Sequence, residues 1–186
     1  MTTLLHIDAS ARSRSISRKL SDEFASAWRA QHPDGDYLYR DVARDPVPFI
    51  DEAWTELCDA VLAHGSTDLD RIAELARTRA QSSAWSIVAP LLAELRAADV
   101  VLIGTPMYNY SIPAALKAWL DQVTFPRMSL APRRFVVTAA RGGSYAAGNP
   151  KGRVRLSGAL PSRLLCRSFR RDGHGLHHCG TGQRQK

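Results

Sequence analysis

Three short segments of the sequence carry residue types that suit ligand binding, and each one directly follows an apolar stretch. The first lies between residues 9 and 17 and holds four serines and two arginines. The second, residues 105–109, reads Thr-Pro-Met-Tyr-Asn, and the third, residues 141–145, begins Arg-Gly-Gly. Serine hydroxyls donate hydrogen bonds to phosphate oxygens, and paired glycines let a backbone approach a flat ligand or a phosphate closely. Each segment is therefore a candidate part of a binding site.

The serine-rich segment leads into a helix predicted over residues 17–31. A helix N-terminus has unpaired N–H groups and a partial positive charge, so it attracts anions. The alternative is that Ser15 or Ser17 is simply the N-cap of this helix. That alternative explains one serine more easily than four.

The stretch 100–109 reads as a buried strand that runs into a loop. Residues 99–104 form a continuous apolar run, which is typical of a strand covered on both faces of a parallel sheet. Ligands of such sheets bind beyond the carboxyl ends of the strands. The loop from Pro106 to Asn109 is thus expected at the binding edge. The Gly142–Gly143 pair follows a strand in the same way, although it is equally consistent with a plain turn.

The elements that position these loops alternate between strand and helix patterns. The predicted strands cover 3–8, 36–42, 99–104 and 134–140, and the predicted helices cover 17–31, 51–62, 69–96 and 113–123. This order predicts an α/β fold with right-handed crossovers and a parallel sheet between helices. Trp54 and Trp85 have the spacing of core residues rather than of a cofactor platform. In a parallel sheet the three loops converge at one edge.

Composition limits the remaining function classes. The chain of 186 residues with 45% hydrophobic residues fits one globular domain. It has no run of about 20 apolar residues for a membrane span and no signal-peptide pattern, so we expect a cytoplasmic protein with no membrane partner. The net charge of +7 arises in residues 151–186, which hold nine basic residues and one acidic residue, against 16 and 17 in residues 1–150. The body therefore shows no electrostatic signature of nucleic-acid binding.

The three loops resemble those of the FMN-dependent NADH azoreductase and quinone reductase family, which has a flavodoxin-like fold. The resemblance covers most of residues 1–149, and its most specific parts are Pro-Met-Tyr-Asn and Arg-Gly-Gly. It implies a three-layer sandwich with strand order 2-1-3-4. The residues that match the cofactor-binding segments of the family are Ser10, Ser15, Ile16, Ser17, Pro106, Met107, Tyr108, Asn109, Ala140, Arg141, Gly142 and Gly143.

The resemblance also implies the chemistry. Ser10 and residues 15–17 match the phosphate-binding serines, residues 106–109 match the segment along the flavin ring and ribityl chain, and residues 140–143 match a second flavin-contacting loop. A Met-Tyr pair offers apolar surface to an aromatic ring, which agrees with this assignment. FMN takes a hydride from NADH or NADPH and passes electrons to a quinone or azo compound in a ping-pong sequence. No catalytic side chain or metal ligand is assigned, and family members are homodimers.

Two regions depart from the family pattern. The segment between Val123 and Arg134 is short, which leaves Phe125 and Met128 as the candidates to cover the ring from the substrate side. From about residue 150 the chain becomes rich in Gly, Arg and His, with no β-branched run that would form a fifth strand. We therefore expect a flavodoxin-like FMN-binding domain over 1–149 and a basic tail over 150–186 that is disordered or frame-shifted. The fifth strand is expected to be missing or replaced, with residues 135–138 exposed or covered by the tail.

Two further interpretations concern the tail, and a third concerns the chain as a whole. His174, His177, His178 and Cys179 could ligate a metal, but their spacing matches no established zinc pattern. The arginines could bind polyanions without specificity, which would make the chain a binding module. Finally, loss of a strand and a helix would make the chain an inactive paralogue. The oxidoreductase remains the leading hypothesis.

Overall fold

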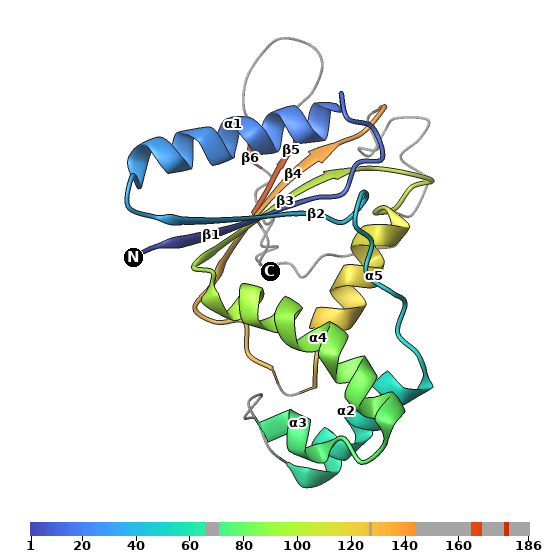
Figure 1. Cartoon of the computed structure of the whole chain (residues 1–186). Helices are drawn as coiled ribbons and strands as arrows, with labels where there is room; N and C mark the ends of the chain where they lie inside the picture. Colours follow the sequence, from blue (N-terminus) through green and yellow to red (C-terminus); the bar gives the residue numbers. More distant parts are fainter. Residues whose placement is uncertain (66–70, 127, 144–164, 169–176, 179–186) are drawn as a thin grey trace, which may run out of the picture.

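The fold is built on a twisted sheet whose first four strands are parallel and lie in the order β2-β1-β3-β4 (Figure 1). The computed structural model describes residues 1–65, 71–126, 128–143, 165–168 and 177–178. The strands are β1 (Thr3–Asp8), β2 (Asp36–Asp41), β3 (Val100–Pro106) and β4 (Arg134–Ala140). The predicted strand order and the flavodoxin-like α/β class are confirmed.

Helices cover both faces of this sheet. Figure 1 shows α1 (Ile16–Gln31) alone on one face, with α4 (Arg79–Ala97) and α5 (Ala114–Val123) on the other. Helix α2 (Glu52–His64) packs against α4 on the side away from the sheet, together with the short α3 (Ile72–Leu75). The result is the three-layer arrangement that the alternating elements predict.

The structure divides one predicted helix into two. A single helix was expected over 69–96, but α3 ends at Leu75 and α4 begins at Arg79. Ala76 is extended, and Thr78 starts α4 with a capping box, in which its hydroxyl accepts from the Gln81 N–H while the Gln81 side chain accepts from the Thr78 N–H. Apolar periodicity continues through this break, and for this reason the pattern alone did not reveal it. Residues 66–70 lie outside the described part of the chain.

The two faces of the sheet have different cores. The face toward α4 and α5 carries the larger apolar core, which includes Leu5, Ile7, Val101 and Ile103. The face toward α1 is apolar only near the amino ends of the strands, where Leu4 and Leu102 pack with Trp28 and other residues. Toward the carboxyl ends the same face becomes polar. Strand register explains this, because side chains two residues apart project from the same face of a strand.

The parallel register brings the polar residues side by side. His6 is paired with Tyr39, and Asp8 is paired with Asp41 on β2 and with Gly104 on β3. These residues face α1 at the end of the sheet where the helix begins. The polar part of the α1 face therefore lies directly behind the serine-rich loop.

The C-terminal region adds two short strands to the sheet. Strand β5 (Leu165–Ser168) pairs in parallel with residues 136–139 of β4, and β6 (His177–His178) pairs antiparallel with β5. A segment of the tail thus occupies the fifth position and covers part of the β4 edge. The composition of the tail did not predict this strand, because edge pairing uses main-chain N–H and C=O groups that any residue except proline supplies. The other tail residues lie outside the described part.

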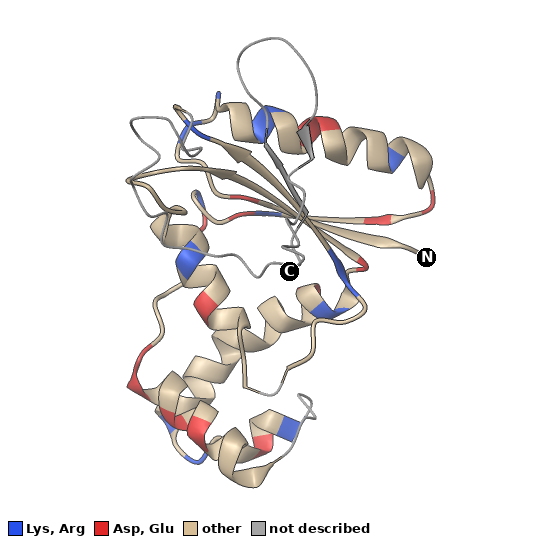
Figure 2. Ribbon diagram, turned by 180° about the vertical axis from the view of Figure 1, so that it is seen from behind, with Lys and Arg blue, Asp and Glu red and all other residues tan. Residues whose placement is uncertain are grey.

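Charged residues of both signs are interspersed along the described ribbon (Figure 2). This agrees with the near-neutral balance of residues 1–150. Among the described residues, no helix combines the length and the apolar character that a bilayer span requires.

Candidate functional site

Main-chain and side-chain hydrogen bonds join the three predicted loops at the carboxyl edge of the sheet. The Tyr108 hydroxyl lies 3.3 Å from the Ser10 Oγ and accepts from the Ala11 N–H at 3.2 Å. The Met107 N–H donates to the Ala140 carbonyl at 2.7 Å. The loop after β3 therefore contacts the loop after β1 through Tyr108 and the last residue of β4 through Met107. Convergence of the three loops, inferred from topology, is confirmed.

The middle loop is a tight turn. Tyr108 and Ser111 exchange two main-chain hydrogen bonds of 2.9 Å, and both residues between them have positive φ, 46° for Asn109 and 66° for Tyr110. Such conformations are uncommon for residues other than glycine and cluster at ligand-binding segments. The turn fixes the direction of Tyr108, whose side chain is half-buried.

The first loop ends in a capped helix N-terminus. Ser15 is the N-cap of α1, and its Oγ accepts from the Arg18 N–H at 3.1 Å. The Ser15 and Ser17 hydroxyls are hydrogen-bonded to each other at 3.1 Å. The first intrahelical bond runs from Lys19 to the Ser15 carbonyl, so the N–H groups of Ile16 and Ser17 have no intrahelical acceptor. Ser15 is thus the N-cap of α1, and it also borders the end of the helix that attracts anions. Phosphate binding by these serines stays a prediction.

Burial separates the roles that these residues can take. Ser10 and Ser17 are fully buried and brace the loop from behind, while Ser15 is at the limit of burial and Ile16 is exposed. A phosphate at this helix end would meet the N–H groups of Ile16 and Ser17 and the Ser15 hydroxyl. These donors suit a phosphate dianion, so the residues present fit the phosphate of a flavin nucleotide.

Arg18, in the first turn of α1, holds the loop in shape. It is only 8% exposed. Its guanidinium donates to the Ser10 carbonyl at 2.6 Å and, through Nε, to the Arg12 carbonyl at 3.2 Å. The side chain therefore fixes the main chain of the loop that precedes its own helix.

The same guanidinium is anchored to the strands by carboxylates. One terminal nitrogen lies 2.9 and 2.8 Å from the two oxygens of Asp41, and the other lies 3.4 Å from Asp8 and 3.1 Å from the Tyr39 hydroxyl. Burial by itself would raise the pKa of Asp41, but the hydrogen bond and charge of Arg18 outweigh it and hold that pKa below its usual value. Partial burial of Tyr39, which is still 49% exposed, followed by the negative charge of Asp8, raises the pKa of Tyr39 to about 12.

The remaining predicted residues line the rim of the site. Pro106, Met107 and Ala140 are half-buried. Asn109 is exposed, as are Arg141 and Gly142. Hydrogen bonds bring together Ser10, Tyr108, Met107 and Ala140. That the other predicted residues belong to the same site stays a prediction. A hollow of about 610 Å³ lies elsewhere, at the other end of α1 beside Pro33 and Tyr37.

One predicted ring-covering residue is a core residue. Phe125 is 3% exposed, and its ring meets Trp54 and Trp85 edge-on, each at 5.8 Å between centroids. Its apolar ring finds a better-packed environment between two indoles than at a loop surface. Met128 is half-buried and also packs against this core. The two tryptophans are half-buried contributors to it, as their spacing predicted.

Sequence reasoning missed the polar network of Arg18 with Asp8, Tyr39 and Asp41. Two signals could have revealed it. Asp8 terminates a buried strand, and Tyr39 and Asp41 lie two residues apart on a strand, so they share a face. A charged residue at the end of a buried strand requires a partner, and Arg18 is in the first helical turn that follows.

The fold and the site together define a flavodoxin-like α/β protein. A family with a flavodoxin-like fold matches residues 2–162. The FMN-dependent NADH:quinone oxidoreductase of Nocardia farcinica is 74% identical over 151 residues, which is 81% of this chain and 70% of that protein. The corresponding protein of Streptomyces avermitilis is 44% identical over 160 residues, 81% of this chain and 68% of that protein. The chain belongs to this family of oxidoreductases, as the loop motifs indicated.

A solved structure supports the fold. An FMN-dependent NADH-azoreductase from Bacillus anthracis, crystallised in complex with FMN, aligns with a TM-score of 0.63 over 81% of this chain and 74% of that chain. The sequences are 21% identical, so the likeness concerns the fold alone. The family match extends to residue 162, beyond residue 149, which limits the resemblance seen in the loop motifs.

Proposed function

We propose that this chain binds FMN noncovalently and passes electrons from NADH or NADPH to quinones or azo compounds. The observation that carries the proposal is the hydrogen bonding of the three loops, through Tyr108 to the Ser10 loop and through Met107 to Ala140. The loops supply a positive helix end, apolar side chains and exposed glycine in one place. Family membership with proteins named for this activity supports it.

The proposed division of labour follows from the chemistry of the residues. Ser15 and the N–H groups of Ile16 and Ser17 hold the phosphate, while Ser10 supports them. Residues 106–109 and 140–143 lie along the ring and ribityl chain. When bound, FMN supplies hydride acceptance from a nicotinamide and electron transfer to the acceptor. The residues of the chain bind and orient the cofactor and exclude water from one side of it.

Titration of the cofactor-free protein with FMN, followed by flavin fluorescence, tests the binding. We expect saturable binding and, with NADH and a quinone, continuous NADH oxidation. A folded protein that binds no FMN would instead support the inactive-paralogue hypothesis. Initial rates measured at several concentrations of both substrates test the ping-pong sequence, which predicts parallel double-reciprocal lines.

Tyr108→Phe tests the site itself. This variant keeps the aromatic surface but removes the hydroxyl that contacts Ser10 and Ala11, so we expect FMN affinity to fall by a factor of about ten, as for one lost hydrogen bond of about 1.4 kcal/mol. Tyr108→Ala also removes the ring and should weaken binding further. Equal affinity in all three proteins would remove Tyr108 from the site.

We also propose a homodimer in the cytoplasm, with the flavin site near the subunit interface. The predicted residues Asn109, Arg141 and Gly142 are exposed in the single chain, which supports a site that a second subunit would cover. Sedimentation velocity measures the mass directly. A monomer at micromolar concentration, with full FMN binding, would contradict this proposal.

A further inference from the structure

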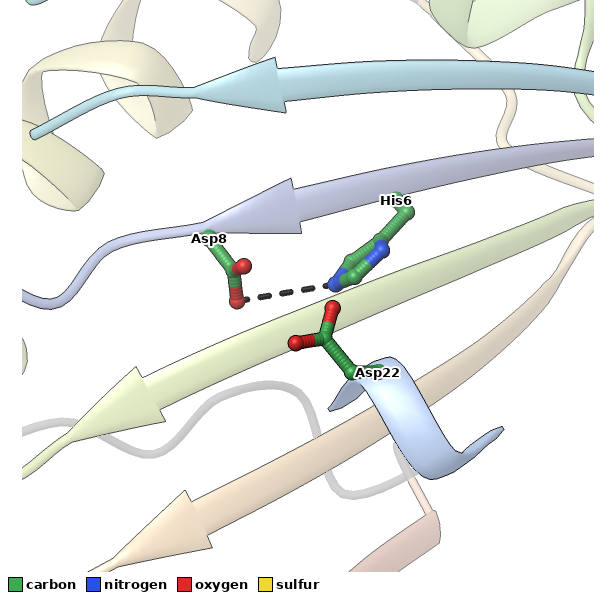
Figure 3. Close-up of side chains that lie close together, drawn as sticks. All are labelled: His6, Asp8 and Asp22. Atoms are coloured by element: carbon green, nitrogen blue, oxygen red, sulfur yellow. Dashed lines mark ion pairs between the residues drawn. The ribbon is translucent and has the colours of Figure 1, made fainter. Parts of the chain in front are cut away.

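A second cluster of chemically reactive side chains lies on the α1 face of the sheet, behind the serine-rich loop. His6 and Asp8 project from β1, and Asp22 projects toward them from α1 (Figure 3). One nitrogen or oxygen atom of each residue lies within 4.8 Å of the corresponding atoms of the other two. His6 and Asp8 are two positions apart on a strand, which gives them the same face.

His6 is the central residue of this cluster. Its side chain is fully buried, and its Nδ1 is hydrogen-bonded to the Tyr37 hydroxyl at 2.8 Å. The opposite nitrogen, Nε2, has no hydrogen-bond partner within the described part of the chain, and it points into the space between the two carboxylates. The nearest acidic oxygen, Asp8 Oδ1, is 3.5 Å away. Buried polar atoms without a partner are rare and call for an explanation.

Asp8 is oriented toward His6 by its other contacts. Its Oδ1 accepts from the Ser21 hydroxyl at 2.8 Å, and its Oδ2 accepts from the Tyr39 hydroxyl at 3.0 Å and faces Arg18. The Arg18 guanidinium therefore contacts Asp8 Oδ2, which is the carboxylate oxygen that faces away from His6. Hydrogen bonds of this kind orient ligand groups at metal sites, as does the bond between Tyr37 and the second nitrogen of His6.

The charge of the region favours a cation. The three carboxylates of Asp8, Asp22 and Asp41 are opposed by two guanidinium groups, the buried one of Arg18 and the exposed one of Arg44, which lies 3.4 Å from Asp41. A divalent ion would neutralise the excess. Arg29 lies farther along α1, where its guanidinium carbon is 5.3 Å from the centroid of the Tyr37 ring.

We propose that His6 Nε2, Asp8 Oδ1 and the Asp22 carboxylate bind a divalent transition-metal ion of the Zn²⁺ type. An imidazole together with two carboxylates suits Zn²⁺ better than Mg²⁺ or Ca²⁺, which prefer ligand sets made of oxygen. Three protein ligands leave a fourth position for water, and the exposed side of Asp22 provides access. The ion would tie β1 to α1. The site does not depend on the proposed flavin chemistry.

Calorimetric titration of the full-length, untagged protein with ZnCl₂, after treatment with a chelator, tests the site. We expect saturable binding and a melting temperature that rises with Zn²⁺ concentration, because an ion that binds only the folded state stabilises it. MgCl₂ at the same concentrations should produce neither effect. No calorimetric signal with ZnCl₂ would overturn the proposal.

Two neighbouring acidic residues on α1 provide a matched pair of variants. Asp22→Asn removes a ligand and should abolish the Zn²⁺ effect, and because Asp22 is exposed this change should not impair folding. Glu23→Gln removes the same charge one residue further on, outside the cluster, and should bind Zn²⁺ as the natural sequence does. Equal weakening by both variants would reduce the site to general electrostatic attraction and overturn it.

Two further variants identify the ligands. Tyr37→Phe removes the hydrogen bond that orients His6 and should weaken Zn²⁺ binding by about 10-fold to 100-fold. Joint replacement of His174, His177 and His178 by Ala should leave the affinity unchanged. If Zn²⁺ binding instead disappears with the tail histidines, the ion belongs to the tail and the proposal fails. FMN affinity, measured in the same variants, tests the proposed function separately.

Discussion

At the scale of single residues, Arg18 joins the serine-rich loop to strands β1 and β2. Arg18→Met would leave the buried Asp8 without its guanidinium partner and the half-buried Asp41 with the exposed Arg44 as its cation, and breaking a buried ion pair costs about 3–5 kcal/mol. We expect urea denaturation to show a loss of that order, together with weaker FMN binding. Arg18→Lys keeps the charge but not the planar set of donors, so its stability should lie between those of the natural sequence and Arg18→Met.

Lys19→Met is the control for Arg18→Met. It removes a positive charge from the next position of α1, where the side chain is exposed, and surface changes of this kind alter stability by no more than about 0.5 kcal/mol. If both variants lose the same small amount of stability, Arg18 does not organise the loop.

Tyr39 predicts a dependence of stability on alkaline pH. Its pKa is raised from 10.0 to about 12 in the folded protein. Below pH 10 the folded and unfolded states both hold the phenolic proton, so the stabilising effect is complete. As the pH rises through this range, the unfolded state releases the proton first, and the free energy of unfolding falls.

Urea denaturation of the natural sequence and of Tyr39→Phe at pH 8, 10 and 11 measures this effect. The variant loses the hydrogen bond to Asp8 and should be less stable at pH 8, but its stability should fall less steeply as the pH rises. Other groups that titrate in this range contribute to both proteins and cancel in the comparison. Parallel curves would show that Tyr39 is not responsible.

At the scale of elements, α1 approaches the sheet closely where β3 carries Gly104. A Cβ at this position would lie 2.3 Å from Asp8 Oδ1 and 2.6 Å from the Ser21 Oγ. Gly104→Ala would therefore separate two buried hydrogen-bonded groups or push α1 away. We expect a loss of about 1–3 kcal/mol in the free energy of unfolding, as for other overpacked sites.

Gly142→Ala is the matched control for Gly104→Ala. A Cβ at Gly142 meets no described heavy atom within 4 Å, so its effect on stability should stay within about 0.5 kcal/mol. Urea denaturation of both variants gives the comparison. Equal losses would mean that a general effect of replacing glycine, rather than the contact with α1, decides the outcome.

At the scale of the whole molecule, the C-terminal region protects the edge of the sheet. Truncation after residue 164 removes β5 and β6 and leaves the β4 edge without its partner strand. Because an unpaired apolar edge promotes association, we expect aggregation at lower protein concentration, measured by light scattering. Removal of residues 179–186 alone keeps both strands and should not change solubility. If the two truncations behave alike, β5 does not protect the edge.

The site could be predicted in outline because its parts are local. The three loops follow apolar runs, and parallel strands end at the same edge, so Ser15, Met107 and Gly142 could be assigned to one region from the sequence. The contacts of Arg18 could not. They depend on the register between β1 and β2 and on the depth at which α1 packs, and both are set by long-range contacts. Phe125 was misassigned for the same reason, since its environment comes from α2 and α4.

The sequence by itself determined the order of elements, the parallel sheet and the segments that converge, because periodicity and turn residues act over a few positions. Thr3–Asp8 and Arg134–Ala140 were predicted with the bounds that the structure gives. The break between α3 and α4 follows from the local capping box of Thr78 and Gln81, which apolar periodicity does not register. Tertiary structure alone decided the pairing of β5 with β4 and the meeting of His6 and Asp8 with Asp22. Both features depend on groups that are distant in the chain, so the packing and hydrogen bonding of the whole molecule decide whether they form. The residue pattern of a short segment contains no information about these long-range interactions.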